Sequence, residues 1–425
     1  MNDELIALLG EREIGRVHRQ KRGKLTFAYD KMWRETDDAY PLSLSMPLTA
    51  AEHGPDVVEA FLWGLLPDNE QVLDRWSRKF HVSARNVFGL LANVGEDCAG
   101  AVQFFPAERL AAVLSGADDE IEWLDEKDVA ARLRALREDH AAWRLPRDTG
   151  QFSLAGAQPK TALLFENGKW GVPSGRMPTT HILKPPTGQF DGHAENEHVC
   201  LALARALGMP TASSRVAHFD NEIAIVVERY DRFRSGNAII RVHQEDVCQA
   251  LGIMPTRKYQ NEGGPGVSEI VELLNTYSSS RNEDVLSFVN AIGFNWLIAG
   301  TDAHAKNYSL LLTSGSRVRL APLYDIASIL PYGAFDIRKV KLSMKIGGEY
   351  TLSEIGIRQW QKLAREIRIN ADELIAGLRM MAERLPDEVA TIGAQLQNEC
   401  LLNPTIGRLT KALIGRARHC QMALA

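Results

Sequence analysis

The stretch GTDAHAKNYSLLL, from Gly300 to Leu312, joins a crowded polar turn to an apolar run. The sixteen residues 283–298 (EDVLSFVNAIGFNWLI) are strongly apolar and predict a core helix, with Asn282 as its N-cap. The turn is therefore expected where a buried helix ends and a strand begins. Within six residues it holds an acid, a histidine, a lysine and an asparagine, namely Asp302, His304, Lys306 and Asn307.

A predicted hairpin brings a second acid back to the same place. YSLLL and RVRLAPLYD flank Ser314-Gly315-Ser316, and the second strand leads to Asp325. Phosphoryl transfer needs an aspartate that orients the attacking hydroxyl, an asparagine and a second aspartate for Mg²⁺, and a lysine near the transferred group. In protein kinases the first aspartate and the asparagine are also five positions apart. Mg²⁺ prefers oxygen ligands and few protein contacts, so Asn307 and Asp325 are a sufficient set.

A simpler interpretation exists for Asp302 and Asn307 taken alone. Such a pair is common by chance, and both side chains can bond the backbone of their own turn. The two further polar groups, the apolar helix before the turn and the returning Asp325 favour the catalytic interpretation. His304 either contacts phosphate or shapes the turn, and we favour shaping.

Composition indicates an ordinary globular protein. The chain has 425 residues, 45% hydrophobic and 24% charged, and two or three subdomains are expected. A net charge of -5 argues against a protein that coats nucleic acid over its whole surface. No signal peptide or membrane span is indicated, so we expect a cytoplasmic protein. Five scattered cysteines read as reduced thiols: Cys98, Cys200, Cys248, Cys400 and Cys420.

The pattern of elements predicts an α+β, bilobal fold. Residues 1–145 form an N-terminal subdomain, 146–235 a small antiparallel-sheet lobe with one helix, and 236–425 a helical lobe with an embedded hairpin. Acidic and basic residues at 116–140 suggest exposed helices or a connector. Helices are expected at 56–66, 84–94, 194–208 and from 353 onward, and hairpins at 12–29, around Glu166-Asn167-Gly168 and around Asp220-Asn221.

A second cluster of candidates lies in the sheet lobe. In FSLAGAQPKTALL (152–164), the small residues Ala155, Gly156 and Ala157 let backbone N–H groups approach phosphates. No GxGxxG or Walker pattern is present, and an ordinary strand entry explains the loop equally well.

Lys184, on the strand HILKPP, suits the α- and β-phosphates if Glu195 or Glu197 fixes it; the alternative is a surface lysine. Backbone groups of Glu228 and Tyr230 can bond an adenine edge. His193, His198 and Cys200 have no zinc-site spacing.

Seven motifs occur along the chain in the order FSLAGAQPKTALL, PTTHILKPP, ENEHVCLALARALG, VVERYDR, RVHQEDVCQALG, TDAHAKNYSLLL and LAPLYDIAS. In this order they resemble the HipA family of serine/threonine kinases, the toxins of HipBA toxin–antitoxin modules. The resemblance is close over about residues 147–380, and PLSLSMPL and FLWGLLPDNE resemble the family's N-terminal domain.

This resemblance implies a kinase-like fold that uses ATP and Mg²⁺ to phosphorylate a serine on a target protein. The target is typically an aminoacyl-tRNA synthetase, with glutamyl-tRNA synthetase as the first candidate. It implies a partner, the helix-turn-helix antitoxin HipB, which binds operator DNA. It makes Asp302 the catalytic aspartate, Asn307 and Asp325 the Mg²⁺ ligands, and Ser153 the site of autophosphorylation. The implied ATP site comprises Ala155, Gly156, Ala157, Gln158, Pro159, Lys160, Lys184, Glu228, Arg229, Tyr230, His304, Ala305, Lys306, Asn307, Tyr324 and Asp325.

Two positions depart from the family pattern. Pro159 stands where relatives often carry a longer polar residue, and Ala303 replaces a common glycine. Both bear on loop mobility and not on the chemistry.

Two rival functions remain open on the sequence. The first is a catalytically weak corepressor that acts with a helix-turn-helix antitoxin on operator DNA. Its support is a run without acids near the C-terminus, in which Arg408, Lys411, Arg416 and Arg418 can touch phosphates. Retention of Asp302, Asn307 and Asp325 argues against it. The second is a small-molecule kinase, which shares the same core chemistry.

Overall fold

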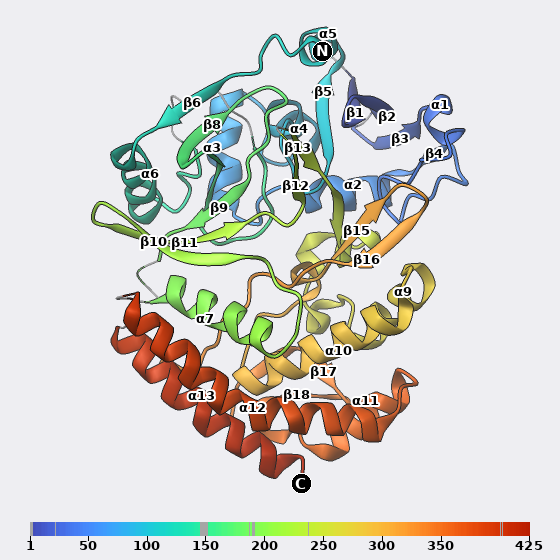
Figure 1. The fold of residues 1–425 in the computed structure, drawn as a ribbon. Helices are drawn as coiled ribbons and strands as arrows, with labels where there is room; N and C mark the ends of the chain where they lie inside the picture. Colours follow the sequence, from blue (N-terminus) through green and yellow to red (C-terminus); the bar gives the residue numbers. More distant parts are fainter. Residues whose placement is uncertain are drawn as a thin grey trace. The chain divides into compact units, whose positions relative to one another are not determined.

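The computed structural model describes residues 3–21, 23–144, 152–186, 188, 192–236, 238–399, 401 and 403–425 (Figure 1). The chain divides into two compact units. The first comprises Met1–Pro185, Ala217–Thr256 and Ser309–Val318, and the second comprises Pro186–Val216, Arg257–Tyr308 and Arg319–Ala425. The predicted boundary between residues 145 and 146 lies outside the described residues, and the division into three parts stays a prediction.

The first unit begins with a five-stranded antiparallel sheet in the order β4-β3-β2-β1-β5 (Figure 1). Its strands β2 (Arg12–Arg19) and β3 (Leu25–Tyr29) confirm the first predicted hairpin. The other strands are β1 (Glu4–Leu9), β4 (Glu52–His53) and β5 (Val102–Pro106).

Short helices accompany this sheet and share its hydrophobic core. Phe27, Phe61 and Phe104 are among the fully buried side chains of that core, and each such burial stabilises the fold by roughly 1.5–3 kcal/mol. The two predicted helices, α2 (Pro55–Gly64) and α4 (Val87–Val94), are confirmed. α1 (Lys31–Arg34) and α3 (Glu70–Phe80) also contribute to this core. η1 (Ala107–Arg109) is followed by α5 (Leu110–Ser115), whose Val113 belongs to a separate buried cluster with residues of β1 and β5.

A six-stranded sheet follows, in the order β10-β11-β9-β7-β8-β6. Asn167 and Gly168 both have positive φ in the β7–β8 turn, as a type I′ hairpin requires. The charged segment 116–140, expected as helices or a connector, supplies both an edge strand and a capped helix, β6 (Ile121–Leu124) and α6 (Glu126–Glu138). The remaining strands are β7 (Thr161–Glu166), β8 (Lys169–Pro173), β9 (His181–Lys184), β10 (Ser214–Phe219) and β11 (Glu222–Glu228).

Two small sheets complete the strands of this part of the chain. β12 (Arg232–Ser235) pairs with β13 (Ala238–Arg241), and β14 (His243–Asp246) pairs with β15 (Ser309–Thr313). The neighbour of β15 is β16 (Arg317–Leu320), which confirms the hairpin predicted around Ser314-Gly315-Ser316. α8 (Val247–Ala250) and η2 (Pro255–Arg257) follow β14.

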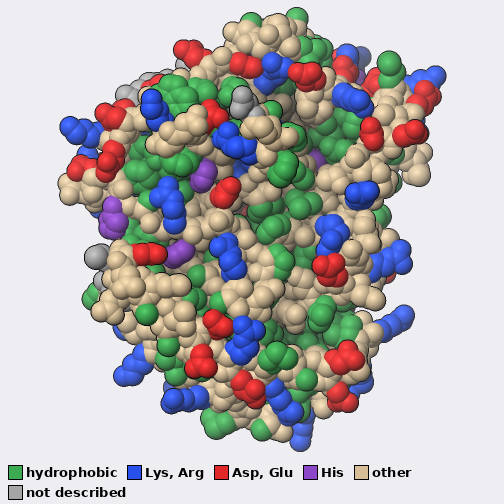
Figure 2. All heavy atoms as spheres, viewed as in Figure 1, with side chains coloured by type: hydrophobic (Ala, Val, Ile, Leu, Met, Phe, Trp, Pro, Cys, Tyr) green, Lys and Arg blue, Asp and Glu red, His purple; other side chains and the backbone are tan. Residues whose placement is uncertain are grey.

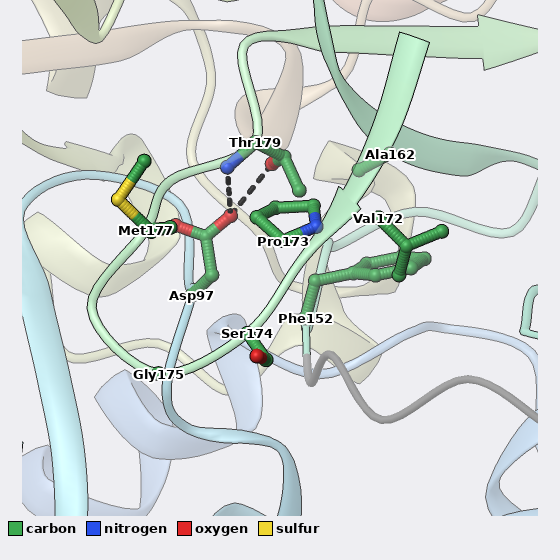
Figure 3. A pocket seen from close by; sticks show the side chains of 9 residues that line it. All are labelled: Asp97, Phe152, Ala162, Val172, Pro173, Ser174, Gly175, Met177 and Thr179. Carbon is green, nitrogen blue, oxygen red and sulfur yellow. Dashed lines mark hydrogen bonds between the residues drawn. The ribbon is translucent and has the colours of Figure 1, made fainter. Parts of the chain in front are cut away.

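A buried cluster of charged side chains joins the N-terminal segment of the first unit to its six-stranded sheet. The Asp97 carboxylate accepts hydrogen bonds from the Thr179 backbone and hydroxyl (Figure 3) and from Arg229, Arg232 and Arg241. Burial alone would raise the pKa of Asp97, but the three guanidinium groups hold it well below its usual range. The pocket beside this carboxylate is roughly the size of one water molecule, too small for a nucleotide.

A second buried contact ties the PLSLSMPL segment to β14. The Glu245 carboxyl, fully buried, accepts hydrogen bonds from the Ser43 hydroxyl at 2.5 Å and the Leu44 N–H at 2.8 Å. Burial raises the pKa of Glu245 to about 8. Folding therefore takes up a proton here at neutral pH.

Replacing Glu245 by glutamine is expected to flatten the pH dependence of stability. The pKa of Glu245 is raised by folding, so its contribution is present at low pH and is lost as pH rises through about 8. Wild type should lose about 2–4 kcal/mol of unfolding free energy between about pH 5 and pH 8 through this group. Urea unfolding across that range measures the slope. The exposed Glu52→Gln variant should keep the wild-type slope, and parallel curves for Glu245→Gln and wild type would contradict the assignment.

The second unit is mainly helical. Its central helix is α10 (Arg281–Ile298), whose Phe288, Phe294 and Trp296 are fully buried. The N-cap is Ser280 and not Asn282 as predicted, because the helix starts a residue before Asn282, which lies in its first turn. The predicted helix 194–208 is confirmed as α7 (His193–Ala206).

The predicted helices after residue 353 are also confirmed. Figure 1 shows the long α12 (Ala371–Asn398) and α13 (Pro404–Ala423) side by side, and α7 packs against both. No helix in the described ranges is long and apolar enough to cross a membrane. The other elements of this unit are α9 (Val267–Tyr277), α11 (Ile357–Glu366), β17 (Lys341–Ile346), β18 (Glu349–Thr351), η3 (Gln260–Glu262), η4 (Ala305–Asn307) and η5 (Leu352–Glu354).

Candidate active site

The polar turn leaves α10 abruptly because of the two residues that follow the helix. Ala299 is left-handed, with φ 53°, and the Gly300 N–H donates to the Asn295 carbonyl at 2.8 Å. A Cβ on Gly300 would lie 2.3 Å from Asn295 Oδ1, so a larger residue would push this turn away from the helix. The glycine therefore fixes where the polar side chains begin.

Backbone hydrogen bonds within the turn set its shape. The His304 N–H donates to the Asp302 carbonyl at 2.8 Å, and the Asn307 N–H donates to the His304 carbonyl at 2.9 Å. The short helix η4 places Lys306 and Asn307 in buried positions, whereas Asp302 is open to solvent. The His304 ring packs edge-on against Tyr259, with 4.9 Å between ring centroids, which agrees with a shaping role.

Asp302 is held by a tyrosine from an earlier segment. The Tyr259 hydroxyl donates to Asp302 Oδ1 at 2.7 Å. Although Asp302 is exposed as a residue, the atoms around its carboxyl group partly desolvate that group and raise its pKa. The Tyr259 hydrogen bond opposes the rise in the pKa, and the charge of Asp325 adds to it. Asp302 is thus more basic than an ordinary aspartate.

The hairpin brings Asp325 to the same turn, as predicted. The Asn307 side-chain amide donates to the Asp325 carbonyl at 3.2 Å, and the Tyr324 hydroxyl donates to the Lys306 carbonyl at 2.7 Å. Asp325 has a left-handed backbone with φ 56°, a conformation that non-glycine residues rarely adopt and that often marks a functional position. Asp302, His304, Ala305, Lys306, Asn307, Tyr324 and Asp325 all lie in the second unit.

The segment that follows Asp325 is clamped to α7. The Asn196 amide donates to the Ser328 carbonyl at 2.7 Å and accepts from the Ser328 N–H at 3.1 Å. The Ser328 hydroxyl in turn donates to the Ile298 carbonyl, at the end of α10. Both side chains are buried, so the backbone that carries Asp325 is fixed on two sides.

The remaining predicted ATP-site residues lie in the first unit. Segment 152–157 pairs with two parts of the N-terminal region: Ser153 N–H donates to the Asp97 carbonyl at 2.9 Å, and the Gly156 carbonyl accepts from Asp68 N–H at 3.1 Å. Gly156 has φ 99°, which favours glycine, and a Cβ there would lie 2.7 Å from Lys160 Nζ. That amine donates to the Ala155 carbonyl at 2.7 Å. Ala157, Gln158 and Pro159 complete the loop.

The strand residues of this group differ in their exposure. Lys184, at the end of β9, is buried, and Glu228, at the end of β11, is exposed. The Tyr230 hydroxyl donates to Gln244. Arg229 is buried in the Asp97 cluster, where it also bonds both oxygens of Asp231 at 3.0 and 2.8 Å. A contact of Arg229 with a nucleotide stays a prediction, and the structure shows a structural use of its side chain.

Of the basic residues near the C-terminus, Arg408, Lys411 and Arg418 are exposed and Arg416 is buried, so their contact with phosphates stays a prediction. The Arg416 side chain is buried, stacks on Trp296 and donates to the Trp296 carbonyl, and Arg408 donates to the Pro331 carbonyl. Figure 2 shows acidic and basic side chains interspersed over the face drawn. Cys400 lies outside the described residues. The other four cysteines are buried and free of disulfides: Cys98, Cys200, Cys248 and Cys420.

Sequence reasoning missed Tyr259 and Asn196, which support the turn that carries Asp302 and the segment after Asp325, and Asp97, which pairs with Arg229 in the first unit. Tyr259 stands 43 positions before Asp302, and Asn196 stands 132 positions before Ser328. No local pattern links residues at such separations. Asn196 stands between Glu195 and Glu197 in the polar first turns of α7, so its burial had no sequence signal.

Comparison with known proteins identifies the family. The HipA N-terminal domain model matches residues 5–105, and the HipA-like C-terminal domain model matches residues 152–389. The chain is 33% identical to Y4mE of Sinorhizobium fredii, whose name assigns it to the kinases, over 97% of each chain. It is 30% identical to the serine/threonine-protein kinase toxin HipA of Shewanella oneidensis, over 86% of this chain and 84% of the relative.

A solved structure agrees with these matches. The complex of Shewanella oneidensis MR-1 HipA, HipB and operator DNA superimposes with a TM-score of 0.85 at 26% identity, over 99% of this chain and 98% of that one. The match confirms the predicted α+β, kinase-like fold class. The chain belongs to the HipA family of serine/threonine-protein kinases.

Proposed function

We propose that this protein is an ATP- and Mg²⁺-dependent serine/threonine kinase that acts as the toxin of a HipBA-type module. The observation that carries the proposal is the hydrogen bond from the Asn307 amide to the Asp325 backbone. It joins the two proposed metal ligands on the turn that also presents Asp302, in the spacing that phosphoryl transfer uses.

Each residue of the turn has a chemical task in this proposal. The Asp302 carboxylate accepts the hydrogen bond of the acceptor serine and takes its proton as the phosphoryl group is transferred. The Lys306 ammonium offsets negative charge on the transferred group. The backbone contacts of Gly300 and His304 keep both side chains at fixed positions. Lys184 and the loop 155–160 are the proposed phosphate ligands of the first unit.

The donor set of the turn fits a magnesium ion. The Asn307 amide nitrogen is engaged with the Asp325 carbonyl, so its oxygen is the atom that would act as a ligand, together with the Asp325 carboxylate. No group of three or more His, Cys, Asp or Glu side chains in the described part of the chain could hold a metal. Two oxygen ligands suit Mg²⁺, which otherwise keeps water and phosphate oxygens. The ion would neutralise charge on the β- and γ-phosphates.

The target and the partner follow from the relatives. We propose a translation component as the acceptor, with an aminoacyl-tRNA synthetase, and glutamyl-tRNA synthetase first, as the candidate. We propose a HipB-like helix-turn-helix antitoxin as the partner, because a HipA of 26% identity was solved with HipB and operator DNA. We assign contact with DNA mainly to the antitoxin, because the net charge of -5 argues against a chain that binds nucleic acid over its whole surface, and Arg416 of the C-terminal basic run is buried.

Labelled ATP tests the proposed function. Purified chain is incubated with γ-labelled ATP and cell lysate, and labelled proteins are identified by mass spectrometry. A labelled protein that is absent with the Asp302→Asn variant supports a protein kinase. Label found only on small metabolites would instead support a small-molecule kinase, and no transfer at all would favour the corepressor.

Removing a metal ligand is expected to weaken nucleotide binding only when Mg²⁺ is present. Asp325→Ala would remove one of the two side chains proposed to hold Mg²⁺, so ATP affinity at limiting Mg²⁺ should fall by about 10-fold or more. Asn307→Ala should act in the same direction. Calorimetry with ATP, with and without Mg²⁺, measures both. Equal ATP affinities of wild type and Asp325→Ala at limiting Mg²⁺ would count against the metal role.

A further inference from the structure

A loop that precedes α9 holds the catalytic turn through three kinds of contact. The Tyr259 hydroxyl donates to Asp302 Oδ1 at 2.7 Å, and the Tyr259 ring packs edge-on against His304. The Lys258 carbonyl accepts from the Ala305 N–H at 3.3 Å. One dipeptide thus contacts the proposed base, the residue that shapes the turn, and the backbone N–H of the residue that follows His304.

The loop that carries Tyr259 is itself firmly placed. The Tyr259 carbonyl accepts hydrogen bonds from the N–H groups of Glu262 and Gly264, at 3.0 and 2.9 Å. A Cβ on Gly264 would lie 2.2 Å from the Arg257 carbonyl oxygen, so the loop closes tightly on itself. The Gln260 side chain accepts from the Lys345 N–H at 2.7 Å, which anchors the loop to β17.

The same strand also supports the turn directly. The Ser343 hydroxyl on β17 donates to the Thr301 carbonyl, next to Asp302, at 2.6 Å. Strand, loop and turn therefore form one hydrogen-bonded assembly within the second unit. The position of the Tyr259 hydroxyl relative to Asp302 is set by this assembly and not by the tyrosine side chain alone.

We propose that Tyr259 is the positioning residue of the catalytic aspartate, holding Asp302 Oδ1 so that Oδ2 faces the acceptor hydroxyl. The proposal rests on the proposed function of Asp302 as the base. A base that is itself oriented by a third group is the general arrangement for activating a hydroxyl. A carboxylate offers about four lone-pair sites on two oxygens, so the tyrosine leaves one oxygen to the acceptor.

Competing explanations predict different kinetics. If the Tyr259 hydroxyl instead blocked the acceptor, removing it would speed transfer or lower KM for the acceptor. If Tyr259 only packed the loop, its hydroxyl would not matter. The other charged groups whose fields reach the Asp302 carboxyl, those of Asp325, Lys258 and His193, are unchanged by a Tyr259→Phe substitution.

The test compares Tyr259→Phe, Asp302→Asn and the double variant with wild type, using the acceptor protein that wild type labels in lysate. Tyr259→Phe keeps the ring on His304 and removes one hydrogen bond to a charged group, so kcat should fall about 10- to 100-fold, with ATP affinity and acceptor KM within about twofold of wild type. On the Asp302→Asn background the same change should have no further effect, because Tyr259 acts through Asp302. Tyr277→Phe, an exposed tyrosine on α9, is the matched control and should resemble wild type.

Each other result has a definite meaning. A kcat for Tyr259→Phe within twofold of wild type overturns the proposal, as does an equal loss on the wild-type and Asp302→Asn backgrounds. A higher kcat or a lower acceptor KM overturns it in favour of a blocking tyrosine. Near wild-type transfer by Asp302→Asn would instead refute the role of Asp302, and that failure is seen without reference to Tyr259.

Discussion

Replacing Asp302 by asparagine is expected to reduce phosphoryl transfer by about 10²–10⁴-fold while ATP binding stays nearly intact. Asparagine is the same size and can still accept the Tyr259 hydrogen bond, so the turn should keep its shape. What it cannot do is take the proton of the acceptor hydroxyl. Desolvation by neighbouring atoms raises the pKa of the Asp302 carboxyl group, which makes the carboxylate a better proton acceptor.

A matched substitution separates this effect from a general loss of aspartate charge. Asp336→Asn removes a carboxylate that belongs to the same unit and forms an ion pair with its exposed neighbour Arg338 at 3.0 Å. It should leave transfer unchanged. Transfer rates are measured with γ-labelled ATP, and ATP affinity by calorimetry. An Asp302→Asn protein that transfers phosphate at near wild-type rate would remove Asp302 from the mechanism.

The parts of the fold with local sequence signals could be predicted. Asn167-Gly168 and Asp220-Asn221 mark hairpin turns because these residues tolerate positive φ, and Asn167, Gly168 and Asp220 have it. The apolar run of α10 predicts a buried helix, because the run is too long for a strand. The proposed catalytic order Asp302, Asn307, Asp325 comes from the sequence because phosphoryl transfer uses those residue types at that spacing.

Features that depend on distant partners could not be predicted. β6 is a strand because Ile121–Leu124 pairs with Trp170–Pro173, although the surrounding charges suggested helix or connector. Arg229 belongs to the ATP site that the family resemblance implies, and its partner Asp97 is 132 positions away. Once the guanidinium is buried, its desolvation is offset only by carboxylates, so tertiary pairing decides its surroundings.

The candidate site shows the same division. The identities of Asp302, Asn307 and Asp325 are local information, whereas their positions depend on Tyr259, Asn196 and Ser343, which are scattered along the chain. A catalytic turn rich in polar groups has no hydrophobic core of its own. It keeps its geometry because other segments satisfy its backbone and side-chain hydrogen bonds, and those segments carry no motif that announces the task.

Ser153 is held in a position that its phosphorylation would disrupt. Its side chain is fully buried, and its hydroxyl donates to the Leu65 carbonyl at 2.7 Å. The neighbouring backbone pairs with Asp97 and with Pro67 through parallel bridges at Phe152 and Gly156. To receive a phosphate, Ser153 must first leave this site, and the segment 152–157 must release at least part of these contacts.

Phosphorylation of Ser153 is therefore expected to abolish most ATP binding and to act as a brake on the kinase. The phosphate brings about -1.5 to -2 charges near pH 7, and its oxygens would face the Leu65 carbonyl, an acceptor with no proton to offer. Returning to the buried position is thus strongly unfavourable, and the loop 155–160 would no longer present its backbone to the nucleotide.

Mass spectrometry of active protein made in cells should find phosphate on Ser153, and the Asp302→Asn protein should lack it. Calorimetry should show ATP affinity at least about 100-fold weaker for the phosphorylated form, whereas Ser153→Ala, which adds no charge, should bind ATP within a few-fold of wild type. A phosphorylated protein that binds ATP as tightly as the unmodified one would refute the brake even if the modification itself were found, because the loop would then hold the nucleotide with the phosphate in place.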